Sequence, residues 1–391
     1  MFELGRQMRT DGGGPVFDLS LGNPSLEPPK IWAEAIIATL RDEPPGMHRY
    51  MTNSGYPEVR AFIAGREAAR YGLEGLEAED VTMTVGAAGA MNVLLRALAD
   101  PGDQIVVPAP YFAEYGHYAA NVQAELAPVP SLPDFRLDLE QIDRSLSTHG
   151  ERARILILNS PNNPTGVVYD EPSLDELAAL LRRHAQRRRR PLWVIEDSPY
   201  RDILHEPGAT APSLLGRYPN TILATSHSKD LGLAGERIGY LVISPEAQGR
   251  ALLRRATAFC NRTLGFVNAP ALMQRVLPAV LGDPRGRVDV QVYARNCATM
   301  AAGLRELGFE LPTPRAGFFL FPALPARLRR PADASPDQPS GDVTLTERLG
   351  EQRTIVVPGT AFGVPEHLRL SLCVEPSVVE GALDAIRGVC A

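Results

Sequence analysis

The stretch that decides the fold is TILATSHSKDLGLAGERIGY, residues 221–240. It opens with an apolar run, residues 221–225, which predicts a buried strand. Lys229 lies in the segment SHSKD, residues 226–230, which follows that strand directly, whereas most lysines lie on a solvated surface. Burial beside a second cation, here Arg237, lowers the pKa of an amine and makes it a nucleophile that can form a Schiff base. The segment therefore predicts a reactive lysine at the end of a buried strand.

The pattern S-x-S-K followed by G-x-R-x-G-Y resembles the cofactor-lysine segment of fold-type I pyridoxal phosphate (PLP) enzymes. Within that group the resemblance is to the class I and II, aspartate aminotransferase-like, aminotransferases. It implies that Lys229 holds the aldehyde of pyridoxal 5'-phosphate as a Schiff base, and that Ser226 and Arg237 bind its phosphate. The cofactor also needs a carboxylate beside its pyridine nitrogen, a phosphate cradle and an aromatic side chain against its ring.

Asp197 is the expected carboxylate. It follows the apolar run 192–195, which predicts a short buried strand, although a strand-end aspartate often only caps a turn. The D-x-x-Y spacing to Tyr200 resembles the family, in which the aspartate binds the pyridine nitrogen and the tyrosine bonds the ring oxygen. Glu196 is expected to point to the opposite side of the extended chain. The resemblance thus makes Lys229, Asp197 and Tyr200 the expected catalytic residues.

Asn163 lies in NSPNNPTG, residues 159–166, after a predicted strand at 154–158. The prolines and the glycine make a rigid turn whatever its function, but they do not explain three asparagines. The segment resembles the family motif N-P-x-N-P-T-G, with one departure at Ser160. By that resemblance Asn163 contacts the ring oxygen of the cofactor and also borders the substrate.

Three small residues, Gly86, Ala87 and Ala88, join a predicted strand at 82–85 to a helical stretch at 91–98. Small side chains let backbone N–H groups approach an anion, and a helix N-terminus favours its charge. Close packing of a helix on a sheet also requires small residues, so packing alone is an alternative explanation of this turn. The position nevertheless matches the phosphate-binding loop of the family.

Phe112 is the expected aromatic side chain against the cofactor ring. It follows a predicted strand at 105–107, in PAPYFAEY, residues 108–115. Its neighbour Tyr111 is a rival one residue away, and an aromatic side chain in a core is the simpler alternative.

Arg369 and Gly22 are the expected substrate ligands. Arg369 is the single cation of a predicted late strand at 367–372, and its guanidinium suits bidentate capture of a carboxylate. The resemblance makes it the ligand of the substrate α-carboxylate. Gly22, in LSLGNP at 19–24, resembles the G-x-P segment whose glycine N–H contacts the same carboxylate.

Tyr50 opens YMTNSGYPEVR, residues 50–60, which resembles the family's Y-x-x-x-x-G-x-x-E-L-R. In the family this tyrosine reaches the phosphate in the neighbouring subunit, so the resemblance implies a homodimer with shared sites. Family members specific for dicarboxylates use a second arginine from the partner. That position falls near Thr263, beside Arg262, and leaves the substrate side chain open.

Composition excludes several classes of protein. The net charge of −6 and a pI of about 5.7 make nucleic acid an unexpected partner. The four cysteines show no metal-ligand spacing, and the one basic run, 187–190, follows a helical stretch whose dipole it would complement. No signal pattern and no stretch long enough to span a membrane is present. We therefore expect a cytoplasmic protein.

Strands alternate with helical stretches from about residue 80 to 245, which predicts an α/β fold with a mostly parallel sheet between helices. We expect a fold-type I PLP transferase in which residues 1–48 form an N-terminal arm and part of the small domain, 49–283 the large PLP-binding domain, and 284–391 the small C-terminal domain. The small domain is expected to contain a helix at 291–307, strands at 317–321 and 354–357, and a mobile surface loop at 331–341.

These patterns predict a PLP-dependent aminotransferase that moves an amino group between an α-amino acid and a 2-oxo acid, with Lys229 as general base and acid. Another PLP reaction on the same fold, such as β- or γ-elimination, replacement or decarboxylation, uses the same residues and stays the alternative. A PLP-binding regulator would need room for a DNA-binding domain before Gly22. A nicotinamide oxidoreductase would need a G-x-G-x-x-G after the first strand, which the chain lacks.

Overall fold

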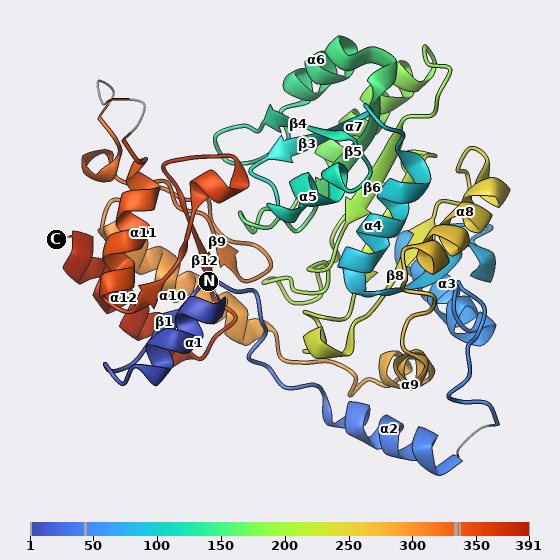
Figure 1. Cartoon of the computed structure of the whole chain (residues 1–391), viewed down its shortest axis with the longest axis horizontal. Helices are drawn as coiled ribbons and strands as arrows, with labels where there is room; N and C mark the ends of the chain where they lie inside the picture. The colour runs from blue at the N-terminus through green and yellow to red at the C-terminus, as the bar shows by residue number, and fades with distance from the viewer. Residues whose placement is uncertain (1, 43–44, 332–334, 336–337, 391) are drawn as a thin grey trace.

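A computed structural model describes residues 2–42, 45–331, 335 and 338–390 of the chain. The described chain forms a larger lobe around a central sheet and a smaller lobe that contains the N-terminal helix and the described residues from 291 onward (Figure 1). Part of the expected mobile loop at 331–341 lies outside the described residues, and Gly341 begins a helix instead. The expected domain limits at 48–49 and 283–284 stay predictions.

The larger lobe is built on a seven-stranded sheet in the order β2-β8-β7-β6-β5-β3-β4. Only β8 runs antiparallel to its neighbours, which confirms the predicted mostly parallel α/β fold. The strands are β2 Val81–Val85, β3 Gln104–Ala109, β4 Glu125–Pro130, β5 Ala153–Asn159, β6 Trp193–Asp197, β7 Thr221–Ser226 and β8 Ile238–Ile243.

Helices cover both faces of this sheet, which explains the unbroken apolar runs in its strands. In β5, Ile155 and Ile157 pack in one apolar cluster, while Leu156 and Leu158 face the opposite cluster. The helices of this lobe are α2 Lys30–Asp42, α3 Pro57–Tyr71, α4 Gly86–Leu98, α5 Glu114–Ala120, α6 Leu139–His149, α7 Glu171–Ala185, α8 Arg250–Thr263 and α9 Ala271–Gly282. The helix expected at 91–98 therefore begins five residues earlier, at Gly86, directly after β2.

The smaller lobe contains two short sheets. Strand β1 pairs in parallel with β10, and β11-β12-β9 form an antiparallel sheet. Its elements are α1 Phe2–Thr10, β1 Phe17–Asp18, α10 Gln291–Glu306, β9 Phe319–Leu320, α11 Gly341–Glu351, β10 Thr354–Ile355, β11 Val357–Pro358, β12 Leu368–Ser371 and α12 Pro376–Cys390. The prediction of a single strand at 354–357 was wrong, because the chain passes from one sheet to the other between β10 and β11.

Short 3-10 turns connect several elements, at Ala78–Asp80, Gly150–Arg152, Ala234–Glu236, Ala326–Leu328 and Gly359–Phe362. Across the described residues, no helix has the length and apolar character that crossing a membrane requires.

The basic run 187–190 was expected to complement the dipole of the preceding helix. In the structure it also makes specific contacts. Arg190 forms ion pairs with Asp103 at 2.7 Å and with Asp100 at 2.8 Å. Arg188 donates a hydrogen bond of 2.6 Å to the carbonyl oxygen of Ala153. The run therefore fastens the end of α7 to the start of β3 and β5.

Candidate functional site

A cavity of about 680 Å³ opens between the two lobes, where the carboxyl ends of β5, β6 and β7 meet the start of α4. Ligands of α/β sheets gather at this edge. Each predicted site residue except Gly86 and Tyr50 lines the cavity, namely Gly22, Ala87, Ala88, Phe112, Asn163, Asp197, Tyr200, Ser226, Lys229, Arg237 and Arg369. Tyr111 does not line it and instead lies against Gly363, so the cavity favours Phe112 over its rival.

Lys229 follows β7 and points into the cavity. Its Nζ donates a short hydrogen bond to the carbonyl oxygen of Gly22. Burial lowers the pKa of this amine, and the charges of Arg237 and Arg369 lower it further, against an opposing contribution from Cys373. A proton is therefore held less tightly here than on an exposed lysine.

Asp197 ends β6 and is buried. Its Oδ2 accepts a hydrogen bond of 2.6 Å from the hydroxyl of Tyr115. Its Oδ1 is also buried, and it has no hydrogen-bond partner in the described structure. Burial raises the pKa of Asp197 to about 6, although the Tyr115 bond acts in the opposite direction. Glu196 points the other way, as expected, and accepts bonds from Ser213 and Leu214.

Tyr115 is a residue that the sequence analysis missed as part of the site. It lies three residues after Phe112, on the first turn of α5, and the two rings meet edge to face at 5.6 Å. Burial and the charge of Asp197 raise the pKa of Tyr115 well above its usual value, so its hydroxyl stays a proton donor. The F-x-x-Y spacing at a helix start is the signal that could have found it.

Asn163 and Tyr200 lie on the same side of the cavity. Asn163 N donates to Oδ1 of Asn159 at 2.6 Å, which fixes the turn after β5. Oδ1 of Asn163 is buried, and the described residues supply it with no partner. Tyr200 is held edge-on between Phe318 and Phe319, at 5.6 and 5.4 Å. Burial raises the pKa of Tyr200, so it remains protonated.

Gly86 and Arg237 form a positively polarised corner at the start of α4. Gly86 has a φ of +68°, and a Cβ there would lie 2.9 Å from a guanidinium nitrogen of Arg237. Arg237 is itself in the left-handed region, with a φ of 53°. Its guanidinium bonds only the carbonyl oxygen of Ala234 among the described residues, at 3.1 Å. The free N–H groups of a helix start together with an unneutralised guanidinium suit a phosphate.

Arg369 is a buried guanidinium that lacks a carboxylate partner in the described residues. It donates a short bond to the carbonyl oxygen of Ser20, while its Nε is buried without a partner. Its charge lies 5.1 Å from the ring centre of Phe319 and 5.0 Å from that of Phe362. Burial lowers the pKa of Arg369 to about 10, so it still carries a charge at neutral pH. Such a group is suited to bind an anion that enters the cavity.

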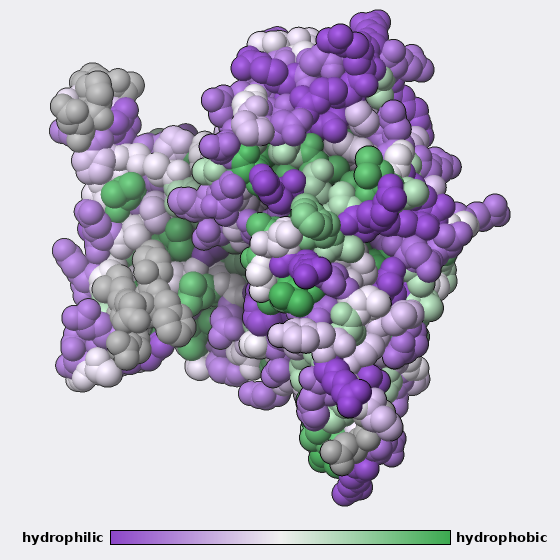
Figure 2. Space-filling view, turned by 45° about the vertical axis from the view of Figure 1, so that its right-hand side comes forward, coloured by the Kyte–Doolittle hydropathy of each residue, from purple (hydrophilic) through white to green (hydrophobic). Residues whose placement is uncertain are grey.

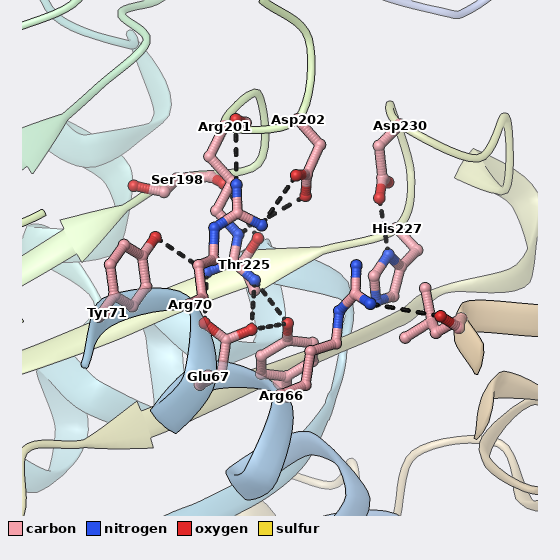
Figure 3. A network of polar contacts seen from close by, with 12 residues as sticks. Arg66, Glu67, Arg70, Tyr71, Ser198, Arg201, Asp202, Thr225, His227 and Asp230 are labelled. Carbon is pink, nitrogen blue, oxygen red and sulfur yellow. Dashed lines mark hydrogen bonds and ion pairs between the residues drawn. The ribbon is translucent and has the colours of Figure 1, made fainter. Parts of the chain in front are cut away.

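The sequence analysis also missed a buried polar network that begins at the residue after Tyr200 (Figure 3). Arg201, the residue after Tyr200, forms two hydrogen bonds of 2.7 and 2.6 Å to the carboxylate of Glu67. The side chains are 3% and 0% exposed, respectively. Tyr240 bonds both partners, at 2.6 and 2.8 Å. Burial alone would raise the pKa of Glu67, but the charge and bonds of Arg201 hold it below its usual value.

Glu67 could have been found from its spacing. It follows Val59 and Ile63 at intervals of four on α3, so it belongs to the buried face of that helix. His227, two residues before Lys229, is buried as well, and its Nδ1 lies 2.8 Å from Oδ2 of Asp230.

A family model described as aminotransferase class I and II matches residues 14–386. A probable aspartate/prephenate aminotransferase of Thermus aquaticus is 30% identical over 386 residues, which cover 95% of this chain and 91% of that protein. An aspartate aminotransferase of Streptomyces avermitilis is 29% identical, with 94% and 88% covered.

Solved structures give the same result. An amino transferase of Eubacterium rectale superposes with a TM-score of 0.89 at 31% identity, covering 99% of this chain and 93% of that chain. Aspartate aminotransferase of Thermus thermophilus with maleate superposes with a TM-score of 0.86 at 26% identity, covering 99% and 95%. The likeness thus extends over nearly the full length of the chain.

Proposed function

This chain belongs to the class I and II aminotransferases, and on that premise we propose which of its residues carry out the reaction. The enzyme uses pyridoxal 5'-phosphate and moves an amino group between an α-amino acid and a 2-oxo acid. When bound, the cofactor supplies an electron sink for negative charge at the substrate α-carbon. Relatives in Thermus aquaticus and Streptomyces avermitilis are named for aspartate, so aspartate is the first substrate to compare.

The buried polar atoms around the cavity fit this cofactor. Oδ1 of Asp197 is an acceptor without a partner among the described residues, as a ligand of a protonated pyridine nitrogen should be in the free chain. Asn163 and Tyr200 would hold the ring oxygen, and Phe112 would lie against the ring. Tyr115 would orient the carboxylate of Asp197 through its 2.6 Å bond.

The start of α4 would hold the phosphate. Gly86, Ala87 and Ala88 place backbone N–H groups there without bulky side chains, and Ser226 and Arg237 face the same corner. A phosphate would neutralise the guanidinium of Arg237, which is without a carboxylate partner in the described chain.

Lys229 is the proposed general base and acid. Burial lowers the pKa of its amine, so Nζ reaches its free amine form more readily than an exposed lysine does. In this form Nζ can accept the proton of the substrate α-carbon and then return a proton on the other side of the transferred nitrogen. The hydrogen bond to Gly22 holds Nζ on the substrate side of the cavity.

Arg369 is the proposed ligand of the α-carboxylate, with the N–H of Gly22 as a second donor. A Cβ at Gly22 would lie 3.0 Å from Phe319 and 3.3 Å from Phe318, so only glycine fits there without displacement. Two fixed points, Arg369 and Lys229, would orient the α-carbon of the substrate.

Tyr50 is proposed to complete the site of a second copy of the chain. It is 88% exposed and does not line its own cavity. Large apolar side chains, Phe259 and Leu264, are 65% and 40% exposed, and apolar side chains gather near the middle of the face in Figure 2. Such exposure favours an interface between subunits, so we propose a homodimer with shared sites.

The reactive Lys229 is the observation that carries the proposal. Borohydride reduction of the holoenzyme should fix the cofactor to one peptide, which contains Lys229, and Lys229→Ala should lose most turnover. An amino acid alone should yield one equivalent of its oxo acid per site, which separates transamination from elimination or decarboxylation. Label on a different lysine would refute the assignment.

A mixture of inactive chains tests the shared site. Tyr50→Ala chains and Lys229→Ala chains should each be inactive alone, but after exchange the intact Lys229 site would receive an intact Tyr50 from its partner. Recovered activity is expected. Absence of recovery despite demonstrated exchange would place Tyr50 outside the neighbouring site.

A further inference from the structure

The wall that faces the substrate side chain can be located from the two groups proposed to bind the substrate. Arg369 donates to the carbonyl oxygen of Ser20, and Lys229 donates to that of Gly22. Leu21 lies between these two contacts and lines the cavity. A substrate whose α-carboxylate binds Arg369 and whose α-carbon lies beside Lys229 therefore has the substituent on that carbon close to Leu21.

The remaining wall beside Arg369 is also apolar. Val357 is the direct cross-strand partner of Arg369 in the β11–β12 pair, so both side chains lie on one face. The ring of Phe362 lies 5.0 Å from the guanidinium carbon. Both residues line the cavity together with Ala361.

The cations of the cavity are already assigned. Lys229, Arg237 and Arg369 are the cationic residues among the described ones that line it, and each has a role at the amine, the phosphate or the α-carboxylate. Glu114 lines the same cavity, and the described residues offer it neither an ion pair nor a hydrogen bond. A second carboxylate on the substrate would therefore find no unassigned cation among the described residues of the same chain in the cavity, and it would meet the exposed carboxylate of Glu114.

We infer that this enzyme acts on α-amino acids with an uncharged, apolar side chain in preference to aspartate or glutamate. The inference rests on the proposed function of the same cavity. Burying a carboxylate without a partner is unfavourable, whereas an apolar side chain gains by leaving water. One methylene in such a pocket changes kcat/KM by about tenfold or more.

The test measures kcat/KM of the holoenzyme for leucine, methionine, phenylalanine, alanine, aspartate and glutamate with one common oxo acid. We expect the best of the three large apolar substrates to exceed aspartate and glutamate by about 100-fold. Aspartate or glutamate as the best substrate would overturn the inference and leave the aminotransferase assignment intact. Turnover with none of the six would count against the proposed function itself.

A binding measurement separates recognition from turnover. Calorimetry on the holoenzyme would compare 4-methylpentanoate with succinate, which are leucine and aspartate without the amino group. We expect 4-methylpentanoate to bind at least about tenfold more tightly. Tighter binding of succinate would contradict the inference even if turnover were slow with every substrate.

Two variants identify the source of the preference. Leu21→Ala should lower the leucine-to-alanine ratio of kcat/KM by about tenfold, because the wall then recedes from a large side chain. Arg262→Ala should leave the aspartate-to-leucine ratio unchanged. A selective loss of aspartate activity in Arg262→Ala would show that the partner subunit supplies the missing cation, and the inference would then be wrong.

Discussion

Asp197 should destabilise the cofactor-free protein at neutral pH. Burial raises its pKa from 3.8 to about 6, so the folded chain binds this proton more tightly than the unfolded chain. The free energy of unfolding therefore falls as the pH rises from 3.8 to about 6 and stays lower above that range. At about 1.4 kcal/mol per pKa unit, the full penalty is about 3 kcal/mol.

Asp197→Asn removes the charge and keeps an oxygen that can accept the Tyr115 bond. For 391 residues, with an unfolding entropy of roughly 2.1 cal/mol/K per residue, 3 kcal/mol corresponds to about 4 °C. Near pH 7.5, the thermal unfolding midpoint of the cofactor-free variant should thus lie about 4 °C above that of the unsubstituted protein. Near pH 4 the two midpoints should coincide, because the folded carboxyl is then already neutral.

Asp11→Asn is the matched control, since Asp11 is exposed. The unfolding midpoint of this variant should equal that of the unsubstituted protein at both pH values. The holoenzyme should respond in the opposite sense, with weaker cofactor binding in Asp197→Asn, because an amide cannot neutralise a protonated pyridine nitrogen. A lower midpoint for the cofactor-free variant near pH 7.5, or a gain of equal size at both pH values, would refute the reasoning.

Three further substitutions test other parts of the structure. Arg369→Ala should raise KM for every amino acid substrate by roughly 30-fold, since loss of a buried charged ligand costs about 2 kcal/mol or more. Steady-state kinetics measures this change, and an effect limited to acidic substrates would place Arg369 at the distal carboxylate instead. Glu67→Gln should lower the unfolding midpoint by about 4–6 °C, because it leaves a buried guanidinium unpaired at a cost of about 3–5 kcal/mol, whereas Glu58→Gln on the exposed side of the same helix should not. Gly86→Ala should weaken cofactor binding about tenfold, because its φ of +68° and a contact at 2.9 Å leave no room for a methyl group. Fluorescence titration measures the cofactor affinity, which should not change in the control Gly116→Ala, where the space is open.

The central sheet was predictable because each of its strands carries its own signal. In β5 four consecutive apolar residues are buried, two on each face of the sheet, and the polar turn with Asn163 follows at once. Parallel strands present such turns at one edge. Local patterns therefore placed the segments of Asn163 and Lys229 at one edge of the sheet, whereas the roles of the two residues were predicted from the family resemblance.

The rest of the site depends on contacts that local patterns do not encode. Tyr115 and Asp197 are separated by 82 residues, and Glu67 and Arg201 by 134. A tyrosine in an apolar setting and a glutamate on a helix are each common, so neither residue predicts which distant residue it will contact. The change of sheet between β10 and β11 has the same origin, because it is set by partners at residues 17–18 and 368–369.

The pairing of β1 with β10 has a consequence for synthesis on the ribosome. All strands of the seven-stranded sheet have been made once residue 243 has emerged, but Phe17 must wait for Thr354. At ~5–20 residues per second, that interval is roughly 5–25 seconds. During this time β1, although it was made long before β10, has no partner strand. Gly22 and Arg369 can therefore meet only after residue 369 has been made, and the nascent chain cannot complete this part of the site before then.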